Sequence, residues 1–301
     1  MPISDFLLLT LVALIWGINF VVIKHSLFYS GFLCVLALRF GLTSIVLSPW
    51  MLKAPKLPVI RLIIMCLLIG CIYFCLLLYG MHLMPATESI IIVQFQVPFS
   101  AILGAYILHE KMHKRAYLGI LLAFIGMIVT IGLPHRQGEI SGILLVLSAA
   151  LTWAYANCYV KSLPKMSPQA LNGFIALIAL IPVTALSLIF EPHSLSQSLF
   201  HPNLHFLYCI LFMVLGSTIT GYGIWFSMLN KHPVYKVAPF NLLTPVFGII
   251  AAQIVVKEPL ATHTLIGALV CMLGLGLILH RPQGQQRTSL QADSADRNTD
   301  S

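Results

Sequence analysis

The chain carries little charge for its length. Of its 301 residues, 9% are Asp, Glu, Lys or Arg, whereas 59% are hydrophobic. A water-soluble domain carries about 25% charged residues, because its surface must be hydrated. The shortage of charge therefore argues against a soluble enzyme or binding domain. It indicates an integral membrane protein, most of whose surface faces lipid.

Several motifs for nucleotide binding, redox chemistry and metal binding are also missing. The sequence has no glycine-rich phosphate-binding loop, so nothing in it supports ATP-driven transport. Its seven cysteines all lie in apolar stretches and none forms a CxxC pair, which argues against a redox or metal site. The histidine pairs His109/His113 and His201/His205 have no third ligand in register. We therefore expect no metal, no cofactor and no catalytic residue.

Long apolar stretches, in contrast, are abundant. A stretch of roughly 20 apolar residues is long enough to cross the membrane as a helix. Ten such stretches, joined by short loops, predict an all-α polytopic membrane protein with ten transmembrane helices. The stretches are 4–24, 31–52, 59–80, 86–108, 115–133, 140–161, 168–190, 206–229, 235–256 and 263–280. The first lacks the basic start and the cleavage site of a signal peptide, so we count it as a span.

The basic residues are distributed unevenly between the loops. An even number of spans places both termini on one side of the membrane, and thirteen of the 17 Lys and Arg residues fall on that side. Lys24, Arg136 and Lys257 fall on the other side, while Arg39 lies inside a span. The positive-inside rule then predicts cytoplasmic termini, and we expect a bacterial inner membrane. Because topology accounts for the net charge of +8, we expect no nucleic-acid partner.

Sequence features recur at about half the length of the chain. The pairs that share one constant spacing are Phe99 and Phe247, Glu110 and Glu258, Gly119 and Gly267, and Gly126 and Gly274. A second, slightly shorter spacing relates Trp16 to Trp153 and Lys24 to Lys161. Because five is odd, two five-span copies enter the membrane from opposite sides, which gives a 5+5 inverted repeat typical of secondary transporters. We expect repeats at 1–133 and 134–281, a polar, disordered cytoplasmic tail at 282–301, and close helix contacts at the paired glycines.

Five segments within the spans carry more distinctive motifs. They are Trp16–Lys24, Leu38–Phe40, Gln94–Gln96, Gly221–Trp225 and Val237–Val246. These motifs resemble those of the EamA family of the drug/metabolite transporter superfamily. The resemblance implies a secondary transporter that exports small polar metabolites, such as amino acids, cysteine or O-acetylserine, by alternating access between the two repeats. We expect a monomer or homodimer whose partners are a small-molecule substrate and the lipid bilayer.

Polar and aromatic residues inside the spans are the candidates for substrate binding. Arg39 lies about eight residues, or roughly 12 Å, inside its span, where a charge is costly. Gln94 and Gln96 are two residues apart on a helix, so we expect only one of them to line a narrow cavity. The predicted substrate-binding residues are Trp16, Asn19, Arg39, Gln94, Asn157, Tyr222, Trp225 and Asn241. The alternative for each is a structural contact between helices.

Three further residues suggest movement or coupling. Pro98 and Pro245 interrupt their spans and free backbone carbonyls, which makes them candidates for a helix break or a gate, with a static kink as the alternative. Glu88 is the acidic candidate for coupling. Together with Arg39 it would meet the two charges of a zwitterionic amino acid, and the alternative is that its carboxylate reaches the lipid headgroups.

Two other functions remain compatible with the sequence. An exporter of amphipathic cations or drugs would need an acidic residue at its site, and Glu88 is the candidate. A polytopic membrane enzyme would need a cluster of acids, bases or metal ligands, yet Arg39 and Glu88 are the clear charges in the spans. Metabolite export is therefore the preferred interpretation, and an enzyme the least favoured.

Overall fold

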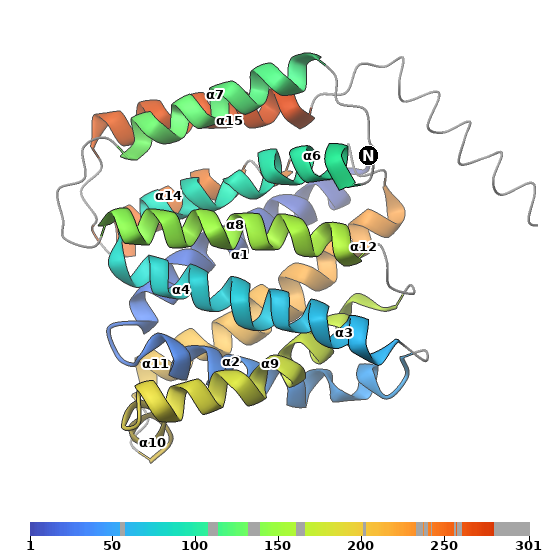
Figure 1. Ribbon diagram of the computed structural model, residues 1–301, viewed down its shortest axis with the longest axis vertical. Helices are drawn as coiled ribbons and strands as arrows, with labels where there is room; N and C mark the ends of the chain where they lie inside the picture. Colours follow the sequence, from blue (N-terminus) through green and yellow to red (C-terminus); the bar gives the residue numbers. More distant parts are fainter. Residues whose placement is uncertain are drawn as a thin grey trace, which may run out of the picture.

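The computed structural model is helical throughout the part of the chain that it describes. The described residues are 1–54, 58–107, 114–131, 139–160, 166–200, 203–232, 237, 240–241, 243–255, 257 and 261–279, and no strand occurs among them. The helices lie alongside one another in a bundle (Figure 1). The polar tail expected at 282–301 and the repeated Glu110 and Glu258 lie outside these residues.

The elements follow one another in the same general order in both halves. The first half contains α1 (Ile3–Ser26), α2 (Phe32–Met51), α3 (Val59–Cys66), η1 (Leu67–Tyr73), α4 (Phe74–Leu83), α5 (Ala86–Ile92), η2 (Val93–Phe95), α6 (Gln96–Ile107) and α7 (Lys114–Ile131). The second half contains α8 (Glu139–Val160), α9 (Pro168–Phe190), α10 (Ser194–Phe200), α11 (Leu204–Leu211), η3 (Phe212–Gly221), α12 (Tyr222–Lys231), α14 (Leu243–Val255) and α15 (Thr262–Leu279).

Helix length and composition confirm an all-helical polytopic membrane protein. Within the described ranges, five helices are long and apolar enough to cross a membrane: Ile3–Ser26, Phe32–Met51, Val59–Leu83, Pro168–Phe190 and Leu204–Trp225. Shorter apolar helices cover Arg115–Thr130, Ile140–Ala156, Leu243–Val255 and Thr262–Ile278. The remaining expected span, 86–108, consists of α5, η2 and α6 in succession.

The bundle has a pair of helices at each edge and further helices between the pairs. Helices α7 and α15 pack together at one edge, and α2 and α9 pack together at the other (Figure 1). Between these pairs, α1 packs against α14, and α4 packs against α8. Lipid tails are as apolar as the buried side chains, so close packing between the helices is what stabilises such a bundle.

Glycine permits the close approach of α7 and α15. A Cβ atom at Gly119 would lie 2.5 Å from the carbonyl oxygen of Gly274, and one at Gly274 would lie 2.5 Å from the backbone nitrogen of Ala123. Gly126 and Gly267 likewise face each other's backbone. The close contacts expected at these glycines therefore form between two helices of the same chain.

Two spans contain wide turns that the apolar pattern does not predict. Both η1 and η3 are π-helical, so each hydrogen-bonded turn holds one residue more than in an α-helix. Moved by the spacing that relates Phe99 to Phe247, η1 falls on 215–221, which lies within η3 and ends at the same residue. The two wide turns therefore occupy equivalent positions in the two halves. Turns of this kind are frequent at functional sites.

Candidate functional site

A cavity of about 490 Å³ lies in the middle of the bundle. Its walls come from both halves: α1, α2, η1, α4, η2 and α6 in the first, and α8, η3, α12, α14 and the turn at 240–241 in the second. Ligand sites typically have volumes of roughly 300–1,000 Å³, so the space suits a small molecule. The cavity is thus built where the two halves meet.

Most of the residues predicted to bind substrate lie on the wall of this cavity. The predicted residues that line it are Trp16, Asn19, Arg39, Gln94, Tyr222, Trp225 and Asn241. The remaining candidate, Asn157, is on α8, but its side chain is outside the described part of the structure. Polar and aromatic residues that the sequence places in several different spans therefore meet in one space.

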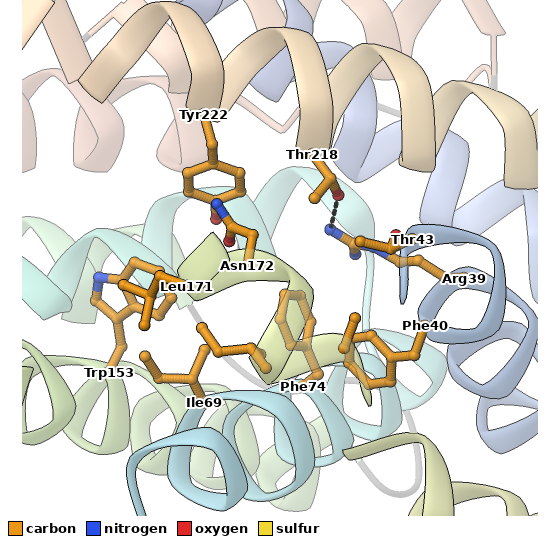
Figure 2. A pocket seen from close by; sticks show the side chains of 12 residues that line it. Arg39, Phe40, Thr43, Ile69, Phe74, Trp153, Leu171, Asn172, Thr218 and Tyr222 are labelled. Atoms are coloured by element: carbon orange, nitrogen blue, oxygen red, sulfur yellow. Dashed lines mark hydrogen bonds between the residues drawn. The ribbon is translucent and has the colours of Figure 1, made fainter. Parts of the chain in front are cut away.

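A smaller chamber of about 110 Å³ adjoins the cavity (Figure 2). Arg39, Phe74, Trp153 and Tyr222 line both spaces. The chamber extends between α2 and α9, where Thr43 and Asn172 add polar groups. Figure 2 shows Arg39 and Thr218 joined by a hydrogen bond on one side of the chamber and Trp153 on the other.

Among the described residues that line the two spaces, Arg39 is the only charged one. Its side chain is buried, with 3% of the residue exposed. The Nη2 group donates a hydrogen bond to Thr218 Oγ1 at 3.2 Å, and the guanidinium carbon lies 4.6 Å from the centre of the Phe74 ring. Within the described structure, the buried Nη1 group has no acceptor and no carboxylate pairs with Arg39. A buried cation with a spare donor therefore faces the site.

Buried oxygen atoms without a hydrogen-bond partner in the described structure also line the cavity. Asn19 Oδ1, Gln94 Oε1 and Thr244 Oγ1 are buried oxygens that find no hydrogen-bond partner among the described residues. All three residues line the cavity, and all three are buried. Because an unsatisfied buried polar group costs about 1–3 kcal/mol, such groups point to water or a ligand.

Aromatic rings close the sides of the cavity in a related way in both halves. The Trp16 ring centre lies 5.0 Å from that of Tyr222 and 5.3 Å from that of Trp225. Trp153, the repeat counterpart of Trp16, lies 4.8 Å from Tyr73. Trp16 also donates from Nε1 to the Ser217 carbonyl at 3.4 Å, which fixes α1 against the wide turn η3. Rigid, flat walls of this kind define the shape of a ligand site.

Gln96 corrects one expectation, because both Gln94 and Gln96 line the cavity. The prediction assumed a regular helix and a narrow pocket. Instead, Gln94 lies in the 3₁₀ turn η2, and Gln96 begins the next helix. Residues two apart point about 120° apart in a 3₁₀ turn, rather than about 160° apart in an α-helix. The cavity is also wide enough that both side chains line it although they point in different directions.

The remaining candidates lie elsewhere. Pro98 and Pro245 each lie in the first turn of a helix, α6 and α14 respectively. In the expected span 86–108 the break is the 3₁₀ turn η2, directly before α6. Glu88 lies in the first turn of α5, half-buried, and is not among the described residues that line the cavity.

Several lining residues were not predicted from the sequence. They are Thr43, Tyr73, Phe74, Asn172, Thr218 and Thr244. The repeat offered one usable signal, because Phe74 and Tyr222 have the same spacing as Phe99 and Phe247, and Tyr222 was a candidate. The threonines gave none. A threonine in a membrane helix commonly bonds its own helix, as Thr130 does with the Gly126 carbonyl at 2.9 Å.

The two ends of α1 are held by different kinds of contact. At its start, Asp5 Oδ2 lies 2.7 Å from Nε2 of His232, which follows α12, and the Phe6 ring lies 5.1 Å from that of Phe240. Near its end, Lys24 Nζ donates to the carbonyl oxygens of Met81 and Met84 at 2.5 and 2.7 Å. Helix α1 therefore connects the second half at one end with the last turn of α4 at the other.

A polytopic helical bundle with a partly polar cavity between its halves has the construction of a membrane transporter. The model of the EamA-like transporter family matches residues 4–132 and 140–280. The chain belongs to the EamA-like transporter family, and it is a transporter rather than an enzyme.

Relatives of known sequence cover nearly the whole chain. A "Probable amino-acid metabolite efflux pump" of Salmonella typhimurium is 34% identical over 283 residues, which are 90% of this chain and 93% of that protein. The protein with the same description in Escherichia coli is 32% identical over 280 residues, covering 90% and 93% of the two chains. A solved crystal structure superimposes with a TM-score of 0.62 over 92% of this chain and 96% of the other. Its sequence identity of 14% makes this a likeness of fold alone.

Proposed function

We propose that the protein exports small amino-acid metabolites, with cysteine and O-acetylserine as the leading cargo. The carrying observation is Arg39, a buried cation with an unpaired Nη1 donor at the central cavity of the described structure. A guanidinium binds a carboxylate through charge-assisted, often bidentate hydrogen bonds. Every amino acid offers a carboxylate. The relatives described as probable amino-acid metabolite efflux pumps support the same cargo class.

The transport cycle we propose is alternating access between two inverted repeats, 1–133 and 134–281, that together hold ten spans. The pattern of helix packing supports it. The contact of α1 with α14 has a counterpart in α8 with η2 and α6, and the contact of α1 with η3 has a counterpart in α8 with η1. The pairs α2–α9 and α7–α15 each join an element to its own counterpart. Rocking one repeat against the other would expose the cavity to each side in turn.

We further propose that both termini face the cytoplasm of a bacterial cell and that the protein works in the inner membrane. The excess of basic residues on the N-terminal side of the spans supports this orientation. Single cysteines at Lys111–Arg115 and within Glu191–His205 should be labelled from opposite sides by an impermeant thiol reagent. Labelling of both from the same side would overturn the inverted-repeat topology.

Export itself is tested in cells that overproduce the chain. Release of cysteine and O-acetylserine should rise with wild-type protein, and Arg39→Gln should remove the rise at equal amounts of protein in the membrane. Arg39→Lys keeps the charge but not the planar pair of donors, so we expect intermediate release. If release of both metabolites stays unchanged while cationic dyes are expelled, drug export is the function. A cation at the cavity wall argues against that outcome, because it repels cationic cargo.

A further inference from the structure

The unpartnered donor and the unpartnered oxygens on the cavity wall of the described structure come from different helices. Among the described residues, the spare donor is Arg39 Nη1, on α2 and hydrogen-bonded through its other nitrogen to η3. The spare acceptors are Asn19 Oδ1, Gln94 Oε1 and Thr244 Oγ1, on α1, η2 and α14. Figure 1 shows α2 at the lower edge of the bundle and α14 in the upper part, so the two kinds of group reach the cavity from different layers.

The three acceptors belong to one closely packed group of helices. A Cβ atom at Gly17, two residues before Asn19, would lie 2.7 Å from the Gly248 nitrogen and 2.8 Å from the Thr244 carbonyl oxygen. A Cβ atom at Gly248 would lie 2.7 Å from Ile90 Cδ1, one turn before Gln94. Helices α1, α5 and α14 therefore meet at close distance, within about one turn along the chain of the three acceptor residues. Such packing holds side chains in place and favours a preformed subsite.

We propose that Asn19, Gln94 and Thr244 form a subsite for the primary ammonium group of the substrate. This proposal rests on the proposed function, in which Arg39 binds the carboxylate. An ammonium group has three N–H donors and no acceptor, which matches a set of three buried oxygens. Glu88, the acidic group suggested by the sequence, is not among the described cavity-lining residues, and these neutral oxygens take its place.

The subsite selects by hydrogen bonding rather than by net charge. Neutral oxygens attract a cation less than a carboxylate does, and Arg39 repels any cation that brings no carboxylate with it. A quaternary ammonium group has no N–H to donate, and an N-acylated amine is neutral with a single N–H. Both leave buried oxygens unpaired, at about 1–3 kcal/mol for each. The preferred substrate is therefore a zwitterionic amino acid with a free amine.

Two isomeric substrates test the contribution of the ammonium group to transport. O-acetylserine and N-acetylserine have the same atoms and a free carboxylate, but only O-acetylserine has an ammonium group. Transport of each is measured in proteoliposomes that contain the full chain, in mildly acidic buffer where the acetyl group does not migrate. Wild-type protein should prefer O-acetylserine by about 10- to 100-fold, since one or two charged hydrogen bonds are at stake.

Variants of the subsite should remove this preference without removing transport. Gln94→Leu and Thr244→Val should each slow O-acetylserine transport by about tenfold, and the preference over N-acetylserine should fall accordingly. Ser187→Ala is the matched control. It also removes a buried hydroxyl without a partner in the described structure, but on α9 and away from the residues that line the cavity, so rate and preference should both persist.

The failures of the two proposals are distinguishable. If neither isomer is transported, or if Arg39→Gln leaves the transport of both isomers unchanged, the proposed function is wrong. Suppose instead that both isomers are transported and that Arg39→Gln abolishes both. The ammonium subsite is then wrong, while the function stands, if wild-type protein shows no preference or if the preference survives in Gln94→Leu and Thr244→Val. If O-acetylserine transport requires Na⁺ and the variants lose that requirement, the three oxygens hold a sodium ion instead, which overturns the proposal.

Discussion

The two halves of the chain share their helix packing but differ in the residue that each places at one wall of the chamber. Helices α2 and α9 are counterparts that pack against each other and line the same chamber. At the spacing that relates Trp16 to Trp153, Arg39 in the first half corresponds to Ala176 in the second. Both residues line the chamber, yet one is a cation and the other a methyl group. A repeated scaffold thus carries a charge at one of two equivalent positions of the chamber and a methyl group at the other.

The neighbours of Arg39 also differ from their counterparts in the other half. Arg39 has the Thr218 hydroxyl on the wide turn η3 and the Phe74 ring beside it. Their counterparts, at the spacing that relates Phe99 to Phe247, are Gly70 on η1 and Tyr222. A Cβ atom at Gly70 would lie 2.5 Å from Ala179 Cβ, so the surroundings equivalent to those of Arg39 have neither the hydroxyl nor room for one. An arginine in the second half would have an aromatic neighbour but no such acceptor to orient it.

Moving the charge tests this difference most directly, and the expected effect is the largest. Arg39→Ala should reduce cysteine export by about 100-fold, because losing one partner of a buried charged contact costs about 2–5 kcal/mol. The double variant Arg39→Ala/Ala176→Arg restores the charge on the other wall. We expect less than about one tenth of wild-type export from it, since no hydroxyl orients the new guanidinium. Export rates in cells with matched membrane protein levels decide the matter, and recovery beyond half of wild type would show that charge alone is sufficient.

The shared packing can be broken on a single helix. Gly274→Ala on α15 places a methyl group 2.5 Å from the Ala123 nitrogen of α7, whereas a Cβ atom at Gly276 meets nothing within 4 Å. Overpacking of this kind costs about 1–3 kcal/mol, so Gly274→Ala should lower the unfolding temperature in detergent. Gly276→Ala should leave the temperature unchanged or raise it slightly, because alanine favours the helix. Equal melting of the two variants would show that α7 and α15 do not depend on this close approach.

The two ends of α1 offer a smaller contrast. Asp5 and His232 join side chain to side chain, whereas Lys24 bonds to backbone carbonyls. Asp5→Asn should weaken the first contact by about 1–2 kcal/mol and open that end of the cavity more often. A cysteine placed at Asn241, in a background without the native cysteines, should then react about 5- to 30-fold faster with a thiol reagent. His232→Gln should act in the same direction, and unchanged reactivity in both variants would show that the contact does not close the cavity.

The sequence indicated the apolar helices and the leading cavity residues because a polar residue is conspicuous in an apolar stretch. Arg39, Gln94 and Asn19 stand out against lipid-like neighbours, and each costs free energy in a membrane unless it has a partner. The same contrast does not mark Thr218 or Thr244, because a threonine satisfies itself on its own helix in most positions. The sequence pattern does not mark the irregular turns either. The positions of η1, η2 and η3 depend on contacts between helices, so the joint placement of Gln94 and Gln96 on the wall could not be derived from helical spacing.

The matched wide turns also bear on the history of the chain. A π-helical turn contains one residue more than the α-helical turn it replaces, so it records an inserted residue. Because η1 and η3 end at equivalent positions, the simplest history places that insertion in a single ancestral half, before its gene was copied and joined to itself. Arg39 has no charged counterpart in α9, so the two copies now differ in charge at this position.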